Sequence, residues 1–186
     1  ISGARKELIN IAEKLNIPVA TSLNAKEIFP YDHPLAVGIP GSYSRACANK
    51  IVAESDLVFF IGSHTGSQIT NNWRLPRKGT SIIQLDINPA ELGRSFPIKI
   101  GLMGDVKATL SKILNNISQK KEIHTDWIKR IQNLVNEWKN EFRSVLGYPH
   151  SAKTSRILED QMNIVIKETG RTPKFNTNRT RVIFLD

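Results

Sequence analysis

Glu54-Ser-Asp-Leu-Val-Phe-Phe-Ile-Gly62 is the stretch that decides the fold of this 186-residue chain. Its centre, residues 57–61, is an unbroken apolar run with β-branched and aromatic side chains, and Gly62 ends it. A strand that is apolar on both faces must be covered on both faces, as a central strand of a parallel sheet is. The polar, glycine-rich segment 62–67 follows where such a sheet presents its carboxyl edge, and ligands bind there in open α/β sheets. The stretch therefore predicts an α/β fold with a ligand site after this strand.

Composition narrows the class of protein. The chain is 40% hydrophobic and 23% charged, which is typical of a globular domain. Its net charge of +9 is spread over both halves without a basic run that carries aromatic residues, so we expect no nucleic-acid partner. The single Cys47 rules out a disulfide within the chain and favours a reducing compartment. No apolar run is long enough for a bilayer and no signal peptide is recognisable, so we expect a cytoplasmic or organellar protein without a membrane partner.

The strands and helices around the central strand follow from periodicity. Apolar residues at helical spacing predict a helix that ends near Asn16, followed by a short strand over residues 17–21. Ser42 is a plausible N-cap for a helix over residues 43–54. Residues 81–86 read as the second strong strand, residues 97–103 as the last one, and Gly104-Asp105 as the start of another helix.

Two positions in this pattern are candidate ligand contacts. Gly38 and Gly41 form a glycine-rich turn before a helix, where unpaired N–H groups can bind an anion, or the turn is a plain connection. Asp86 ends its strand at the edge where its carboxylate could accept hydrogen bonds from a ribose, or it caps the turn that follows. The residues alone leave both alternatives open.

The last third of the chain reads as helical. A polar linker at residues 119–122 leads to a long amphipathic helix whose two tryptophans, Trp127 and Trp138, are more typical of packing than of a cofactor site. A second helical pattern covers residues 154–168, and residues 182–186 read as a buried strand. The four histidines share no metal-ligand spacing, and no nucleophile elbow, G-x-G-x-x-G or P-loop is present. From the residues alone we predict a nucleotide-binding-like α/β domain with helices appended.

Several ordered stretches resemble the central domain of thiamine-diphosphate-dependent enzymes, most closely the acetolactate synthase-like group. They are Leu35-Ala-Val-Gly38 with Gly41, residues 53–62, residues 83–93 (Ile-Gln-Leu-Asp-Ile-Asn-Pro-Ala-Glu-Leu-Gly), Gly104-Asp105 and, upstream, residues 16–21, Lys26 and residues 29–34. The resemblance covers about residues 4–118. It implies a Rossmann-like parallel sheet with covering helices in residues 1–118, a helical connector in residues 119–170, and the start of the cofactor-diphosphate domain in residues 171–186.

The resemblance also implies a dinucleotide or nucleotide site. Carried over by position, the cofactor-binding residues are Gly38, Gly41 and Ser42 near the diphosphate, Gly62 and Ser63 at the central strand, Asp86 and Ile87 near adenosine, and Gly104 and Asp105 near adenine. FAD-binding members usually have His where Pro40 stands and Arg where Ser63 stands. Loss of those groups favours ADP, or an empty site, over FAD.

For activity, the resemblance implies a fragment. The parent would be a thiamine-diphosphate-dependent 2-oxo acid decarboxylase and carboligase, a transferase or lyase that works as a homo-oligomer with upstream and downstream domains in the same chain. Its catalytic Glu and its Gly-Asp-Gly metal motif do not occur in this sequence, so we expect no catalytic residue, no metal ligand and no activity here; thiamine diphosphate and Mg²⁺ would bind to the parent. The alternatives are a stand-alone nucleotide-binding module or a sirtuin-like NAD-dependent deacylase, although the latter usually carries a four-cysteine zinc site.

The family's first strand would precede Ile1, so we expect the sheet to lack a central member beside residues 57–61. Unpaired N–H and C=O groups on that strand would each cost about 1–3 kcal/mol if buried. The apolar run 182–185 is the one spare strand in the sequence that can fill the gap. We therefore expect a marginally stable chain that associates easily.

Overall fold

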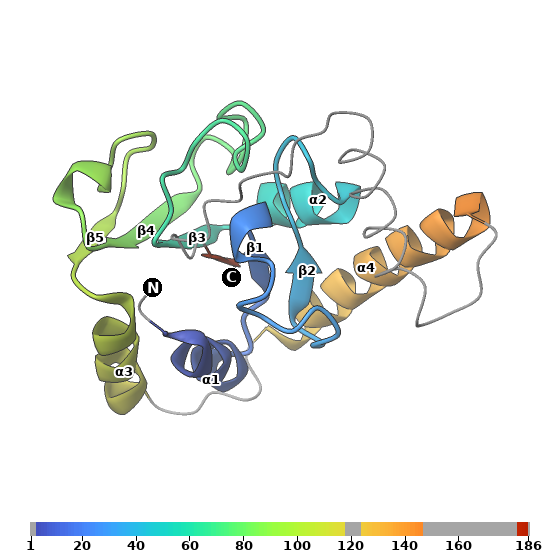
Figure 1. Cartoon of the computed structure of the whole chain (residues 1–186). Helices are drawn as coiled ribbons and strands as arrows, with labels where there is room; N and C mark the ends of the chain where they lie inside the picture. The colour runs from blue at the N-terminus through green and yellow to red at the C-terminus, as the bar shows by residue number, and fades with distance from the viewer. Residues whose placement is uncertain (1–2, 118–123, 147–181, 186) are drawn as a thin grey trace, which may run out of the picture.

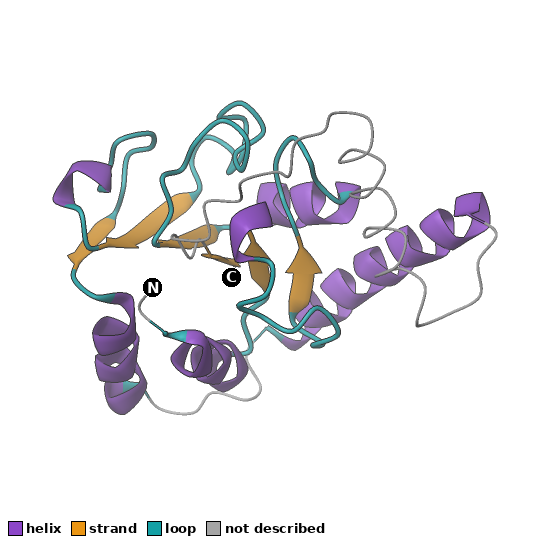
Figure 2. Cartoon of the chain, viewed as in Figure 1, coloured by secondary structure: helices purple, strands orange, loops and turns teal. Residues whose placement is uncertain are grey.

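A computed structural model describes residues 3–117, 124–146 and 182–185 (Figures 1 and 2). The helices are α1 (Arg5–Leu15), η1 (Leu23–Ala25), α2 (Ala46–Glu54), η2 (Pro89–Glu91), α3 (Val106–Asn116) and α4 (Thr125–Leu146). The strands are β1 (Val19–Thr21), β2 (Ala36–Gly38), β3 (Leu57–Ile61), β4 (Ser81–Asp86), β5 (Ile100–Met103) and β6 (Val182–Leu185).

All six strands form one sheet in the order β2-β1-β6-β3-β4-β5. β1 and β2 are parallel, as are β3, β4 and β5, and β6 is antiparallel to both of its neighbours. β3 and β4 pair along their length, from Leu57 opposite Ser81 to Ile61 opposite Leu85. If β6 takes the first position, the order corresponds to the 3-2-1-4-5-6 arrangement of doubly wound folds. The predicted α/β, Rossmann-like fold is confirmed.

β6 occupies the gap that the sequence analysis expected in the middle of the sheet. Its first residue, Val182, lies opposite Thr21 of β1 and Ile61 of β3, and Leu185 lies opposite Val58. The strand therefore bridges the two parallel halves of the sheet, and its backbone pairs with β1 on one side and β3 on the other. Because β6 runs the opposite way, the chain enters this position from the carboxyl edge of the parallel strands.

Helices cover both faces of the sheet. α1 packs against α3 on one side, whereas α2 lies on the other side and α4 packs against it (Figure 1). The core combines the helix faces with the inner positions of the strands. The most completely buried side chains include Leu8, Ile11, Val19, Val37, Ile51, Val58, Phe60, Ile61, Leu85, Leu110 and Ile131. The core therefore reaches from α1 to α4, so α4 is packed onto the α/β unit. None of the helices in the described ranges is long and apolar enough to span a membrane.

Three sequence predictions differ from the structure. α2 begins at Ala46 with Arg45 as its N-cap, not at residue 43 with Ser42; before it, the N–H of Ser42 donates to the carbonyl of Gln68 and the N–H of Arg45 to that of Ile39. β2 was not predicted as a strand; it has only three residues, two of which pair with β1. β5 covers Ile100–Met103 rather than residues 97–103, although the N–H of Lys99 does donate to Ile82. The helical pattern predicted for residues 154–168 lies outside the described residues.

Candidate functional site

The predicted site residues all follow the carboxyl ends of the parallel strands. They are Gly38, Gly41 and Ser42 after β2, Gly62 and Ser63 after β3, Asp86 and Ile87 at β4, and Gly104 and Asp105 after β5. The fold thus brings them to one edge of the sheet. They form two groups there, because β1 and β6 separate β2 from β3.

The turn between β2 and α2 is held by hydrogen bonds within the protein. Gly41 donates its N–H to Oδ1 of Asn49 at 2.7 Å, and Nδ2 of Asn49 donates to the Gly41 carbonyl at 3.0 Å and to Oγ of Ser44 at 2.7 Å. Ser42 donates its N–H to the carbonyl of Gln68 at 2.7 Å. Of the three residues predicted near a diphosphate, Gly41 and Ser42 therefore have backbone N–H groups that already donate within the protein.

Close packing explains the glycines of this turn. A Cβ at Gly41 would lie 1.8 Å from the carbonyl oxygen of Gln68, and the φ of Gly41 is +101°, which L side chains rarely adopt. A Cβ at Gly38 would lie 2.7 Å from Cδ of Arg45. Gly41 lets the β2–α2 turn cross the edge of the sheet and contact the loop after β3, a role that needs no ligand.

The residues after β3 are also tightly integrated. Gly62 donates its N–H to the carbonyl of Leu85 at 2.8 Å, and Ser63 is fully buried. Oγ of Ser63 accepts a hydrogen bond from the N–H of Thr65 at 3.2 Å. The side chain of Ser63 thus stabilises the turn and points away from solvent.

The carboxyl ends of β4 and β5, here called the β4–β5 corner (residues 86–88 and 103–105), differ from the turn. A carboxylate oxygen there has no hydrogen bond within the described residues, and apolar side chains there are exposed. Asp86 lies opposite Met103 in the sheet, and the Asp86 carbonyl accepts a hydrogen bond from Gly104 at 3.0 Å. Oδ1 of Asp86 accepts from the N–H of Asn88 at 2.9 Å, which is the capping role left open above. Within the described part of the chain, Oδ2 of Asp86 accepts no hydrogen bond, so the buried carboxylate can serve the turn and a ligand at once.

Apolar side chains flank this carboxylate. Ile87 is 71% exposed and Met103 is 68% exposed, whereas Asp86 itself is 8% exposed. Asp105 lies beside them and caps α3, since its Oδ1 accepts a hydrogen bond from Ala108 at 2.9 Å. The corner is a buried hydrogen-bond acceptor with an open apolar surface at its rim.

Other groups along the edge share these two properties. Large exposed apolar side chains follow or end each of the parallel strands: Leu23 after β1, Tyr43 after β2, Trp73 after β3, Ile87 after β4 and Met103 at the end of β5. Ser22 and Thr65 are buried near the same edge, and their hydroxyl oxygens have no hydrogen-bond partner in the described structure. These two hydroxyls are buried polar groups whose hydrogen-bonding capacity the described residues leave unsatisfied.

Sequence reasoning missed a cluster of polar and charged residues that joins the loop after β3 to the loop after β4. Nδ1 of His64 lies 2.7 Å from Oε1 of the buried Glu91, and Nη2 of Arg94 lies 3.2 Å from Oε2 of Glu91. Arg94 also donates to the carbonyl of His64. Gln84 donates a hydrogen bond from Nε2 to the carbonyl of Glu91, and its Oε1 accepts one from the N–H of Gly93. His64 lies 20 to 30 positions before Gln84, Glu91 and Arg94 in the sequence, so no local spacing indicates that it joins them.

A second polar contact fixes α4 on α2. Arg130 binds Glu54 through two hydrogen bonds of 2.9 and 3.0 Å, and this lowers the pKa of Glu54. The guanidinium of Arg45 lies 4.7 Å from the ring centre of Trp138, and burial lowers the pKa of Arg45. Burial also raises the pKa of the nearby Cys47 thiol. Trp138 therefore packs against a cation, as the prediction of a packing role implied.

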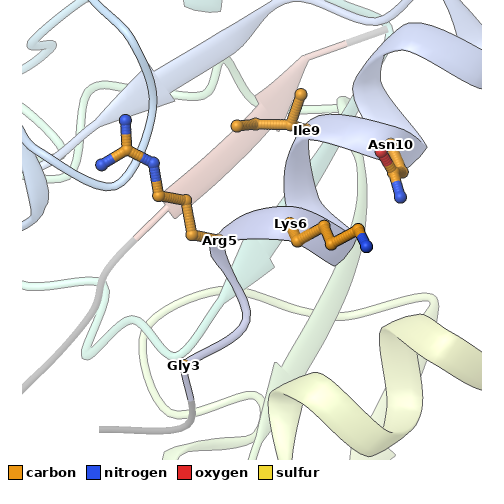
Figure 3. A pocket seen from close by; sticks show the side chains of 5 residues that line it. All are labelled: Gly3, Arg5, Lys6, Ile9 and Asn10. Carbon is orange, nitrogen blue, oxygen red and sulfur yellow. The ribbon is translucent and has the colours of Figure 1, made fainter.

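The structure also has a cavity of about 350 Å³ at the start of α1 (Figure 3). Gly3, Arg5, Lys6, Ile9 and Asn10 line it, and none of the predicted site residues does. Nη1 of Arg5 donates to the carbonyl of Glu27. Among the described residues, no group of three His, Cys, Asp or Glu side chains could hold a metal ion.

Comparison with known proteins gives one family. The profile described as "Thiamine pyrophosphate enzyme, central domain" matches residues 1–113. A probable acetolactate synthase large subunit of Methanocaldococcus jannaschii is 38% identical over 72% of this chain and 23% of its own length. The corresponding protein of Methanococcus aeolicus is 28% identical over 100% of this chain and 31% of its own, and an acetolactate synthase large subunit of Buchnera aphidicola is 30% identical over 84% and 26%. The chain thus spans about a quarter to a third of the length of these relatives.

Proposed function

We propose a function from the fact that this chain belongs to the family of thiamine pyrophosphate enzyme central domains. The chain is the central part of an acetolactate synthase-like enzyme that decarboxylates a 2-oxo acid and transfers the remaining acyl group to an acceptor. Its similarity to three acetolactate synthase large subunits supports this assignment. The parent works as a homo-oligomer in the cytoplasm or an organelle, and upstream and downstream domains complete it.

The thiamine cofactor belongs to those other domains in this proposal. Thiamine diphosphate supplies the electron sink for decarboxylation, and Mg²⁺ attaches its diphosphate to oxygen ligands. We assign residues 1–118 to the central domain, residues 119–170 to the connector and residues 171–186 to the start of the next domain. With no catalytic Glu or metal motif in the sequence, the chain by itself should show no pyruvate turnover above a protein-free control when both cofactors are added.

Within the central domain, we propose that the β4–β5 corner binds the adenosine part of a nucleotide. The observation that carries this proposal is the buried Asp86, whose Oδ2 remains open next to the exposed Ile87. A ribose hydroxyl can donate to that oxygen while the base lies on Ile87 and Met103. Gly104 lets the backbone approach closely, since its φ is +158°.

ADP fits the described edge better than FAD. The position where FAD-binding members carry an Arg is the fully buried Ser63, whose hydroxyl is already hydrogen-bonded to Thr65. The turn donors at Gly41 and Ser42 are engaged as well. The diphosphate end of the ligand therefore receives few contacts, which a small nucleotide tolerates better than a large flavin dinucleotide.

Calorimetric titration of the chain with ADP tests the corner. We expect Asp86→Ala to weaken ADP binding about ten- to a hundredfold, because a hydrogen bond to a charged acceptor is worth about 1.5–3 kcal/mol. Asp56→Ala is the matched control, since Asp56 is an exposed carboxylate that directly precedes β3, at the opposite edge of the sheet. Equal ADP affinity in wild type and Asp86→Ala would refute the assignment. Stoichiometric yellow FAD in the purified protein would overturn the preference for ADP.

A further inference from the structure

The β4–β5 corner carries two carboxylates and no basic side chain among its own residues. It consists of Asp86-Ile-Asn88 at the end of β4 and Met103-Gly-Asp105 at the end of β5. The two segments lie together because Asp86 pairs with Met103 in the sheet. Asp86 is 8% exposed, whereas Asp105 is exposed to solvent. A ligand that enters the corner therefore meets two negative charges, and one of them is buried.

The hydrogen bonds inside the corner leave an acceptor open. The backbone N–H of Asn88 donates to Oδ1 of Asp86 at 2.9 Å, and the backbone N–H of Gly104 donates to the Asp86 carbonyl at 3.0 Å. Both of these donors are thus engaged, while Oδ2 of Asp86 accepts no hydrogen bond from the described residues. An open carboxylate oxygen accepts a hydrogen bond from a hydroxyl group and repels the negatively charged oxygens of a phosphate.

The N-terminus of α3 is already occupied by an anion of the protein. Free N–H groups at the start of a helix attract anions, and α3 begins at Val106, directly after the corner. Asp105 supplies a carboxylate at this place: its Oδ1 accepts from the N–H of Ala108 at 2.9 Å, and its carbonyl accepts from the N–H of Thr109 at 3.0 Å. The positive end of the helix is therefore compensated without a ligand.

Three basic residues lie near the corner in the sequence, and two of them are directed elsewhere. Nη2 of Arg94 lies 3.2 Å from Oε2 of Glu91 and donates to the carbonyl of His64, so this guanidinium faces the loop after β3. Lys99 precedes β5 and thus lies at the opposite edge of the sheet. Lys107 lies in the first turn of α3 and is exposed, and it remains as a cation that an experiment must separate from the two carboxylates.

We propose that the β4–β5 corner selects nucleotides with free 2′ and 3′ hydroxyl groups and rejects nucleotides that carry a phosphate on either one. This selectivity rests on the nucleotide site proposed above and adds the ligand class to it. A ribose hydroxyl donates to Oδ2 of Asp86 and brings no further charge. A phosphate on the ribose brings a third anionic group next to Asp86 and Asp105, and like charges placed together in a binding site weaken affinity strongly. The corner therefore suits ADP and excludes its 2′- and 3′-phosphorylated forms, which are the adenosine ends of NADP and coenzyme A.

Calorimetric titration of the full chain with four ligands tests the selectivity. The ligands are ADP, 2′-phospho-ADP, 3′-phospho-ADP and 2′,3′-dideoxy-ADP, which differ only at the ribose. The dideoxy form loses the hydrogen bond to Asp86 without adding a charge, so we expect it to bind about tenfold more weakly than ADP. We expect each phosphorylated form to bind at least about a hundredfold more weakly than ADP, because repulsion adds to the lost hydrogen bond.

Two variants separate the charges of the corner. In Asp86→Asn the amide oxygen can still accept from the N–H of Asn88, while Nδ2 replaces the open acceptor by a donor. The preference for ADP over the phosphorylated forms should then fall at least about tenfold. Asp105→Asn retains a residue type that caps helices well and should reduce the preference by a smaller factor. Lys107→Met and Asp56→Asn are the controls and should leave the preference unchanged, since Asp56 lies at the opposite edge of the sheet.

The outcomes distinguish the selectivity from the site itself. If ADP binds and either phosphorylated form binds equally well, the selectivity is wrong while the nucleotide site stands. If ADP does not bind, the proposed site is wrong and the selectivity fails with it. A preference that is unchanged in Asp86→Asn also contradicts the proposal, because the buried carboxylate would then not sense the ribose. Should Asp86→Asn fail to fold, the four affinities of the wild-type chain still decide.

Discussion

Two corners of the same sheet edge are both candidate ligand sites in the sequence, and the structure distinguishes them. The β2–α2 turn has the glycines and the helix of a phosphate-binding loop, and the β4–β5 corner has one acid at the end of a strand. In the turn, Asn49 and Gln68 engage the backbone donors of Gly41 and Ser42. At the corner, Asp86 keeps one oxygen open beside the exposed Ile87.

The difference shows how a site is recognised. A glycine-rich turn offers an anion site only while its N–H groups lack partners. The β2–α2 turn uses those groups to fix the loop after β3, so its glycines serve packing. At the corner, Oδ1 of Asp86 accepts a hydrogen bond from the turn, whereas Oδ2 accepts none from the described residues. We therefore expect changes in the turn to reduce stability, and changes at the corner to reduce ligand affinity.

Gly41→Ala should have the largest effect. The new methyl would clash with the Gln68 carbonyl, and the residue would stay in the left-handed region, so we expect a loss of about 3 kcal/mol in the free energy of unfolding. Urea denaturation followed by circular dichroism measures it. Gly66→Ala is the control, because a Cβ there meets nothing within 4 Å. If the two variants have equal midpoints, the close approach of the turn to the β3 loop is wrong.

Asn49→Ala should come second. It removes three hydrogen bonds to Gly41 and Ser44 and leaves the N–H of the buried Gly41 unpaired, which costs about 1–3 kcal/mol. The same urea melts measure the loss, with Asn10→Ala on the exposed face of α1 as the control. A loss of stability with unchanged ADP affinity would support a packing role for the β2–α2 turn. A selective loss of ADP binding at unchanged stability would show that the turn is a ligand site after all.

Ile87→Ala should act on affinity rather than stability. Ile87 is largely exposed, so its truncation leaves the fold unchanged but removes apolar surface that a base would cover. We expect ADP to bind about fivefold more weakly, which corresponds to about 1 kcal/mol. Calorimetric titration compares it with Ile100→Ala, an exposed residue at the opposite end of β5. An identical loss in both variants would place the base elsewhere.

Glu54→Gln should have the smallest effect, and it depends on pH. The hydrogen bonds from Arg130 lower the pKa of Glu54, so the ion pair adds stability above the ordinary carboxyl range and loses it as pH falls through the lowered pKa. Urea midpoints of wild type and variant should differ slightly at neutral pH and converge in acid. Because the pair lies between α2 and α4, neither corner should respond. A gap of unchanged size at a pH below the lowered pKa of Glu54 would contradict this origin.

The strongest strands could be predicted from the sequence alone. Residues 57–61 and 81–86 have the bounds of β3 and β4, since long apolar runs ending at Gly62 and Asp86 determine them locally. The start of α2 was placed too early, because Ser42 has the side chain of an N-cap while its backbone is bound to Gln68. The His64–Glu91 contact joins two loops, and no periodicity encodes such a pair.

By itself the sequence determined that this chain forms a parallel α/β sheet and that its candidate ligand groups meet at one edge. Those properties depend on hydrophobic patterning and strand direction, which are local and repeat along the chain. The tertiary structure decided which groups remain available at that edge and in which direction the strand in the middle of the sheet runs. A backbone N–H that already donates within the protein is not available to a ligand, and the position between β1 and β3 is occupied by β6. Both outcomes depend on residues that are distant in sequence, such as Gln68 for Ser42 and Val182 for Ile61.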